Sequence, residues 1–269
     1  MDSVGIVILT KDNFDVIKRC LDSFEDKNTY DNIKFYIGDT GSTEENYNKL
    51  SNYIKEFKYT TKIVKFNYYH FAKNNNWIVK NLVKENFILF CNDDIELIDD
   101  SITNLVKNWT EDLGTVGCKL LFSNNTIQHG GQMHIINKKD YVWSAGHKYY
   151  GKPDKELSIE YNVGNTFAFC LTTKKVFNLV NGIPEIFKRC FEDVLYNINC
   201  SKNNLRHKFI GNTSCYHHES LTRKKEDKDD YMSVRDFTLL KLEMQEFYKK
   251  HKSEIILNKD EEITYVYEH

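Results

Sequence analysis

The feature of this sequence that most restricts its fold is the alternation, through its first half, of short apolar runs with amphipathic segments. The apolar runs are VGIVILT (4–10), IKFYIGD (33–39), KIVKFN (62–67) and FILF (87–90). Runs of this length bounded by polar residues are typical of buried strands. Because the segments between them carry apolar residues at helical spacing, we predict a mostly parallel central sheet with helices on both faces, an α/β fold.

The helices can be placed from the same pattern. The first is expected to be capped by Asp12 and to bury an apolar face made of Val16, Ile17, Cys20, Leu21 and Phe24. The triplet GST (41–43) opens the second, and a short third helix is expected around 77–83. Later segments predict strands at 114–122 and 166–172, a helix near 174–180, and a closing amphipathic helix with the stripe Phe237, Leu240, Met244 and Phe247.

Composition excludes several classes of partner. The chain has 269 residues and a net charge of −2, so it has no excess of positive charge for nucleic acid or an anionic membrane surface. Its seven cysteines form no CxxC pair, which suits buried thiols in a reducing compartment. The amino terminus does not resemble a secretion signal and no apolar run reaches about 18 residues, so we expect a soluble, cytoplasmic protein without a transmembrane segment.

Polar side chains stand where the predicted strands end. Thr10 ends the first strand, Asp39 ends the second, and the pair Asp93 and Asp94 follows the fourth. Right-handed crossovers place these positions along one edge of the sheet. Ligands of open α/β sheets bind at that edge, so we expect a binding site there.

Two common nucleotide motifs are absent. GHKYYGKP (146–153) has the spacing of a phosphate-binding P-loop, but Pro153 stands where a magnesium-binding hydroxyl is needed. No GxGxxG follows the first strand, which excludes a nicotinamide or flavin dehydrogenase. A glycoside hydrolase needs two carboxylates that straddle a bond, and the adjacent Asp93 and Asp94 should diverge instead.

Seven stretches in a fixed order resemble the family-2 glycosyltransferases of the GT-A fold. They are ILTKDNFDVIKRCLDSF, IGDTGSTEEN, HFAKNNNWIVKN, ILFCNDDIEL, VGCKLLFSNNTIQHGG, FEDVLYNINC and YHHES. TIQHGG and HHES are most similar to a rhamnosyltransferase-like branch that builds surface polysaccharides. The resemblance implies a GT-A domain at 1–221, with a nucleotide-sugar-binding half at about 1–98 and an acceptor and catalytic half at 99–221. A charged loop and a C-terminal helix at 222–269 would pack on this domain.

This resemblance implies metal-dependent, inverting transfer of a sugar from a UDP-, dTDP- or GDP-sugar to a glycan or other hydroxyl acceptor. A divalent cation would stabilise the diphosphate leaving group. Asp94 matches the metal-binding Asp of the family and His217 its metal-side His, although the adjacent His218 remains an alternative. Mn²⁺ accepts both carboxylate and imidazole, and Mg²⁺ is the other candidate.

The same resemblance implies roles for further residues. The donor-binding positions are matched by Thr10, Asp39, Lys73, Asn76, Asp93 and Asp94. Asp193 matches the catalytic base that takes the proton of the acceptor hydroxyl. Glu192 is expected to contact the acceptor or support the base, and Trp143, with the aromatic residues near Tyr149, is expected to offer the acceptor a flat platform.

Simpler explanations and two rival functions remain open. Asp39 also suits a tight turn before Gly41, and Glu192 with Asp193 suits the acidic start of a helix. One rival is a carbohydrate- or nucleotide-binding GT-A protein without turnover, although such a protein needs no base. The other is a sugar nucleotidyltransferase, which would need a glycine-rich loop after the first strand, where ILTKDNFD has no glycine.

Overall fold

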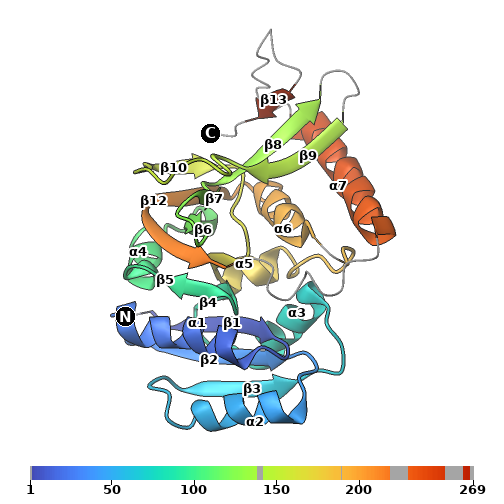
Figure 1. The fold of residues 1–269 in the computed structure, drawn as a ribbon. Helices are drawn as coiled ribbons and strands as arrows, with labels where there is room; N and C mark the ends of the chain where they lie inside the picture. Colours follow the sequence, from blue (N-terminus) through green and yellow to red (C-terminus); the bar gives the residue numbers. More distant parts are fainter. Residues whose placement is uncertain (1, 138–141, 189, 219–229, 252–262, 267–269) are drawn as a thin grey trace.

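The first half of the chain forms a parallel sheet in the order β4-β1-β2-β3 (Figure 1). The computed structural model describes residues 2–137, 142–188, 190–218, 230–251 and 263–266. The strands are β1 (Val4–Thr10), β2 (Ile33–Asp39), β3 (Thr61–Lys65) and β4 (Phe87–Asn92). Thr10 pairs with Asp39 and Leu9 with Asn92, so the carboxyl ends of the central strands lie side by side.

Helices cover both faces of this sheet, as predicted. Alternate residues of β1 divide between the two sides, with Ile6 and Ile8 in one core cluster and Val7 and Leu9 in the other. The first cluster packs against α1 (Phe14–Lys27), α2 (Glu44–Tyr53) and α4 (Ser101–Lys107). The second packs against α3 (Phe71–Asn81), α5 (Lys174–Leu179) and α6 (Glu192–Ser201). The doubly covered sheet predicted from the sequence is therefore present.

Asp12 does not cap α1, contrary to the sequence prediction. The N-cap is Asn13, and Asp12 adopts a positive φ of 54°. Its carboxylate accepts hydrogen bonds from the backbone N–H and hydroxyl of Thr43 (2.9 and 2.7 Å) and from the amide of Asn46 (2.8 Å). The loop after β1 is thereby tied to the start of α2, which begins directly after the GST triplet as expected and has Thr43 as its N-cap.

The third helix begins earlier than predicted. It was expected around 77–83, but α3 spans Phe71–Asn81 because His70 acts as its N-cap. Nδ1 of His70 accepts the backbone N–H of Lys73 (3.4 Å), and the side chain of Asn74 accepts the N–H of His70 (2.7 Å). Histidine is outside the usual group of cap residues, so the sequence pattern did not indicate this start.

The second half extends the sheet to the order β10-β12-β6-β11-β4. The strands are β6 (Leu113–Leu121), β10 (Ile159–Asn162), β11 (Phe169–Thr173) and β12 (Arg206–His217). Two short strands join at the side, β5 (Ile95–Leu97) on β12 and β7 (Ile127–His129) on β6. His217 pairs with Ile95, so the end of β12 lies beside the residues that follow β4.

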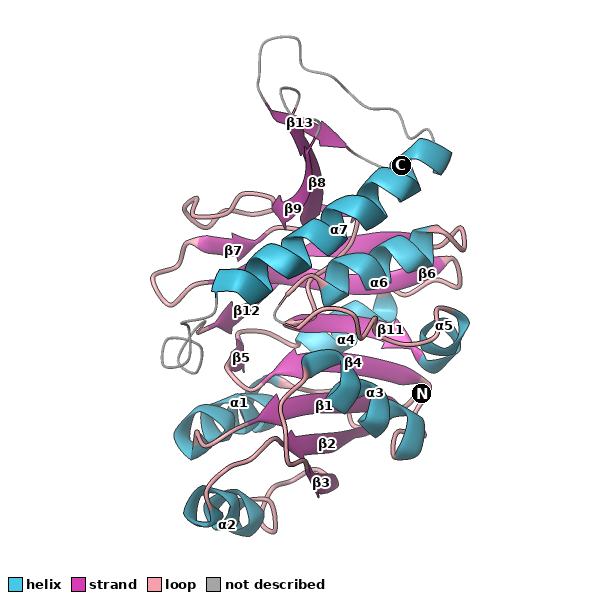
Figure 2. Cartoon of the chain, turned by 90° about the vertical axis from the view of Figure 1, so that its right-hand side faces the viewer, coloured by secondary structure: helices cyan, strands magenta, loops and turns pink. Residues whose placement is uncertain are grey.

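A smaller layer completes the fold. It contains the sheet of β8 (Gln132–Asn137), β9 (Val142–His147) and β13 (Ile263–Val266), together with α7 (Asp230–His251). Figures 1 and 2 show α7 running beside α6 and β9. Leu240, Met244 and Phe247 are buried against α6, whereas Phe237 is 38% exposed. Within the described ranges, no helix has both the length and the apolar character needed to cross a membrane.

Candidate functional site

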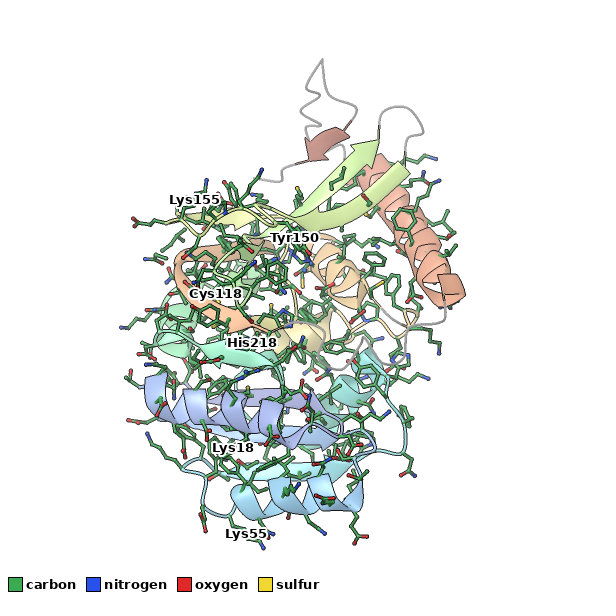
Figure 3. All side chains as sticks on the ribbon, in the orientation of Figure 1. Lys18, Lys55, Cys118, Tyr150, Lys155 and His218 are labelled. Carbon is green, nitrogen blue, oxygen red and sulfur yellow. The ribbon has the colours of Figure 1, made fainter. Side chains whose placement is uncertain are left out.

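A cavity of about 620 Å³ opens at the carboxyl ends of β1 and β4. Its walls come from distant parts of the chain: the strand ends, the start of α6, the end of β12, and β9 with the loop after it. Figure 3 labels Tyr150 of that loop, which lines the cavity, and His218, which directly follows β12. The predicted site residues that line this cavity are Thr10, Asp93, Asp94, Glu192, Asp193 and His217.

Asp93 is held in a buried position beside a second carboxylate. Its Oδ2 accepts a hydrogen bond from the hydroxyl of Thr10 (2.7 Å). Burial, and then the negative charge of Asp94, raise the pKa of Asp93 to about 7. A positive charge placed between the two residues would relieve this repulsion.

Asp94 faces the imidazole of His217. Oδ1 of Asp94 lies 3.1 Å from Nε2 of His217, and both side chains are largely buried. Burial raises the pKa of Asp94, whereas His217 lowers it below its usual value when Nε2 of the ring carries a proton. The two atoms approach without hydrogen-bond alignment, so Oδ1 is a buried acceptor that no donor satisfies among the described residues.

His218, the alternative left open by the sequence, is engaged elsewhere. Its Nδ1 lies 2.7 Å from the hydroxyl of Ser123, and its Nε2 lies 2.8 Å from Oε2 of Glu96. His217, by contrast, contacts Asp94, Asn92 and Gln128. Of the two histidines, His217 is therefore the one placed beside the Asp pair.

The residues present fit a divalent cation that is shared with an anionic ligand. In the described part of the chain, no three His, Cys, Asp or Glu side chains gather as a metal site. Asp94 and His217 nevertheless offer two ligand atoms 3.1 Å apart. Bonds of about 2.1 Å at right angles separate adjacent ligands by roughly 3.0 Å, so this spacing suits one cation. Its other ligands would then be water and the oxygens of a bound anion.

Asp39 combines a turn-forming role with a free oxygen. Its Oδ1 accepts the backbone N–H groups of Gly41 (3.2 Å) and Ser42 (3.1 Å), and Gly41 has the positive φ (115°) that this turn requires. Its Oδ2 is buried and has no hydrogen-bond partner within the described residues. Asp39 does not line the main cavity, but it pairs with Thr10, which does. The free oxygen can accept an N–H or hydroxyl of a ligand bound at this strand end.

Asp193 is presented by the first turn of α6. Its Oδ2 accepts the backbone N–H of Phe167 (3.3 Å), and the positive end of the helix dipole is favourable for its charge. The helix is entered through Phe191, which has a φ of 77°, a left-handed conformation that is unfavourable for an aromatic residue. Such strain is often found where a fold must present a side chain at a functional site.

The structure does not bring Asn76 to the cavity. Its buried amide donates to the carbonyl of Ile183 (2.8 Å) and to Oε1 of Glu185 (2.9 Å), and it accepts the N–H of Ile183 (2.8 Å). These contacts hold the segment before α6 in place. Lys73 lines a second hollow together with Tyr68, Tyr69, His70 and Lys188, next to the main cavity. Trp143 lies on β9 opposite Ile136, and its side chain is outside the described residues.

Several cavity residues were not identified from the sequence. They are Tyr69, Gln128, His147 and Lys188, whereas Tyr150 is one of the aromatic residues near Tyr149 that the sequence indicated. Gln128 lies in the TIQHGG stretch that the sequence comparison singled out, so a signal for it existed. Lys188 lies in an irregular loop, and no motif or periodicity in the sequence pointed to it.

The sequence matches a family model described as "Glycosyl transferase family 2" over residues 5–177. It is 27% identical over 235 residues to "O-antigen biosynthesis protein RfbC" of Myxococcus xanthus, covering 82% of this chain and 18% of that protein. It is 25% identical over 236 residues to "Uncharacterized protein y4gI" of Sinorhizobium fredii (strain NBRC 101917 / NGR234), covering 83% of this chain and 25% of that protein. The chain thus spans a quarter or less of these relatives.

Two solved structures share the fold. A mannosyltransferase, PcManGT from Pyrobaculum calidifontis in complex with GDP-Man and Mn²⁺, superimposes with a TM-score of 0.63 at 11% identity, covering 92% of this chain and 64% of that one. GalNAc-T7 with UDP, GalNAc and Mn²⁺ superimposes with a TM-score of 0.65 at 12% identity, covering 81% of this chain and 44% of that one. Both are glycosyltransferases of the GT-A fold, which is the fold predicted from the sequence.

Proposed function

The chain belongs to glycosyltransferase family 2, and on that premise we propose that it moves a sugar, with inversion, from a nucleotide-diphosphate sugar to a glycan or other hydroxyl acceptor. The observation that carries this proposal is the convergence of Asp94, Asp193 and His217 on one cavity, although they are far apart in the sequence. A cation site and a base facing a shared space are what such a transfer requires.

The donor would bind at the strand ends. Asp94 and His217 would hold Mn²⁺ or Mg²⁺ against the diphosphate, and a bound cation supplies positive charge that stabilises the departing nucleotide. Thr10 and Asp93 would position the ribose, and the free Oδ2 of Asp39 would accept a hydrogen bond from the base or ribose. The solved structures with GDP-Man and Mn²⁺, and with UDP and Mn²⁺, support a nucleotide diphosphate and a metal as ligands.

Asp193 would act as the base. The acceptor hydroxyl attacks the anomeric carbon from the face opposite the diphosphate, its proton passes to Asp193, and the bond from the anomeric carbon to the diphosphate oxygen breaks in the same step. The hydrogen bond from Phe167 and the start of α6 fix the carboxylate in the cavity wall. Glu192 lies beside it and would contact the acceptor.

The similarity to the O-antigen protein supports a role in the synthesis of surface polysaccharide. Tyr150 is 59% exposed and lines the cavity, and it would contact the acceptor. A flat, exposed aromatic ring suits the face of a sugar. We propose this residue for the platform that the sequence had assigned to Trp143 and its aromatic neighbours.

Thermal-shift measurements with UDP, dTDP, GDP and CMP, each with and without Mn²⁺, test the donor site. We expect a nucleoside diphosphate to raise the melting temperature only when Mn²⁺ is present, because the cation joins the protein to the diphosphate. Equal stabilisation without metal would refute metal-dependent binding.

An assay of sugar transfer to a glycan acceptor, monitored through the release of nucleotide, tests the role of Asp193 as the base. Asp193→Asn should keep the metal-dependent stabilisation and lower the rate of transfer by about 10²- to 10⁴-fold, the usual contribution of a general base. Glu192→Gln, a change of the adjacent acid in the same helical turn, is the matched control and should retain more activity. Full transfer by Asp193→Asn would show that another group is the base, or that none is needed.

A further inference from the structure

The imidazole of His217 is held between two side-chain amides with opposite hydrogen-bonding roles. Its Nδ1 lies 2.5 Å from Oε1 of Gln128, a buried residue of β7. Its Nε2 lies 3.2 Å from Nδ2 of Asn92, at the end of β4. The amide oxygen of Gln128 can only accept a hydrogen bond, and the amide nitrogen of Asn92 can only donate one.

Both contacts require the same tautomer of a neutral ring. Because the oxygen of Gln128 accepts, Nδ1 of His217 must carry the proton. Because the amide of Asn92 donates, Nε2 must present its lone pair. The two contacts act together, because the contact with Gln128 requires the proton on Nδ1 and the contact with Asn92 requires that Nε2 has none.

In this tautomer the close approach of His217 to Asp94 is unfavourable until a cation is bound. A lone pair on Nε2 and a carboxylate oxygen stand 3.1 Å apart with no proton between them, and Oδ1 of Asp94 is satisfied by no donor in the described ranges. Two electron-rich atoms in this arrangement repel each other unless a cation is added. The opposite tautomer would place an N–H at this position and block the cation.

We propose that Gln128 is a positioning residue that fixes the Nδ1–H tautomer of His217, so that Nε2 and Oδ1 of Asp94 can bind one divalent cation, which would take the lone pair of Nε2 from the amide of Asn92. The inference rests on the proposed function, because that proposal assigns the cation to Asp94 and His217. An outer partner of this kind commonly changes metal affinity by about 10- to 100-fold.

His218 provides an internal control. It also has a side-chain partner at Nδ1, the hydroxyl of Ser123, but its Nε2 faces Glu96 and not Asp94. Removing the hydroxyl of Ser123 therefore takes away the Nδ1 partner of a histidine that does not face the proposed cation position. Ser123→Ala should leave metal binding unchanged.

The tautomer can be measured directly. We expect ¹⁵N NMR of the ring nitrogens in the metal-free protein at neutral pH to show His217 as the Nδ1–H form in the wild type. Gln128→Glu keeps an acceptor oxygen and should retain that form, whereas Gln128→Met has a similar shape without the oxygen and should shift the ring toward the Nε2–H form. An unchanged Nδ1–H ring in a folded Gln128→Met protein would overturn the proposal.

Metal affinity is the second readout. Titration of Mn²⁺ followed by electron paramagnetic resonance, with UDP or GDP present, should show about 10- to 100-fold weaker binding by Gln128→Met. Gln128→Glu and Ser123→Ala should bind as the wild type does. Wild-type affinity in Gln128→Met, or a loss as large in Ser123→Ala, would contradict a specific role for Gln128.

The two readouts separate this inference from the proposed function. If the wild type binds no Mn²⁺ with either nucleotide, the proposed metal site fails, whatever tautomer His217 adopts. If the wild type binds Mn²⁺ but the Gln128 variants change neither the tautomer nor the affinity, the metal site stands and the role of Gln128 is refuted. If Gln128→Met does not fold, Gln128→Glu provides the test. A His217 ring in the Nε2–H form, or weakened Mn²⁺ binding, in Gln128→Glu would contradict the proposal.

Discussion

The burial of two histidines, His134 and His207, should make the protein less stable in mild acid. His134 on β8 and His207 on β12 are each 1% exposed. Nδ1 of His134 lies 2.5 Å from the hydroxyl of Tyr248 on α7, so this histidine joins the small sheet to the closing helix. Burial, and then the proximity of His207, lower the pKa of His134 to about 3. Burial lowers the pKa of His207 to about 4.

The sign of the effect follows from where the protons bind. In the unfolded chain each histidine has a pKa near 6.5 and takes up a proton below that pH, whereas in the folded protein both stay neutral. Their contribution to stability is therefore complete above pH 6.5 and is lost as the pH falls toward 4 and 3. Each pH unit costs about 1.4 kcal/mol, so between pH 7.5 and 5.0 each histidine should lower the free energy of unfolding by about 2 kcal/mol.

Urea unfolding at pH 7.5 and pH 5.0, followed by tryptophan fluorescence, measures this difference. His134→Leu should reduce the pH-dependent loss of stability by about 2 kcal/mol relative to the wild type, because it removes one of the groups that takes up a proton on unfolding. Because each variant is compared with itself at the two pH values, any effect of the substitution on the free energy of unfolding that does not depend on pH cancels. Tyr248→Phe is the matched control, since it removes the hydrogen bond of His134 but keeps its burial, and its pH dependence should match that of the wild type.

The reasoning would be refuted if His134→Leu lost as much stability as the wild type between the two pH values. That result would mean that His134 is protonated in the folded protein and is therefore solvated or paired with a charge. If Tyr248→Phe reduced the pH-dependent loss of stability by the share assigned to His134, the hydrogen bond, and not burial, would control the pKa of His134.

Two further predictions concern the cavity and its support. Asp94→Asn should abolish the Mn²⁺-dependent rise in melting temperature with nucleoside diphosphates. If the rise persisted in this variant, residues other than Asp94 would have to bind the metal. Asn76→Ala should lower the free energy of unfolding in urea by about 2–3 kcal/mol, because it leaves the backbone of Ile183 without its partners. The nucleotide affinity of folded Asn76→Ala should stay within a few-fold of that of the wild type. A complete loss of binding would instead support the contact between Asn76 and the donor that the sequence predicted.

The part of the fold that the sequence predicted depends on local patterns. The strands at 4–10 and 33–39 match β1 and β2 because their apolar residues are long enough, and uniformly apolar enough, to be buried on both faces. Parallel strands with right-handed crossovers then place Thr10, Asp39 and Asp94 at one edge whatever the details of the loops. The proximity of these residues follows from the sheet topology, which could be predicted from the sequence.

The features that the sequence did not reveal depend on contacts between distant residues. Gln128 meets His217 across 89 positions, through the short strand β7 that no periodicity indicates. The strand β13 arises because Ile263–Val266 pairs with β8, and a four-residue strand after a charged segment has no distinct signal. Asp12 was a reasonable cap by type, yet its carboxylate found three donors at the start of α2.

The position of Asp193 depends on the closing helix as well as on its own. Phe191 must adopt its left-handed conformation for the chain to enter α6 with Asp193 in the cavity wall, and this costs about 1–2 kcal/mol. The conformation persists because the ring of Phe191 packs against Phe187 (6.4 Å between centroids) and against Phe237 of α7 (6.3 Å). Phe237 had been assigned to the apolar stripe of an amphipathic helix, but its ring is 38% exposed and contacts the residue that sets the start of α6. The closing helix is therefore part of the scaffold that holds the proposed base, because the strain two residues before Asp193 is sustained by contacts that α7 supplies.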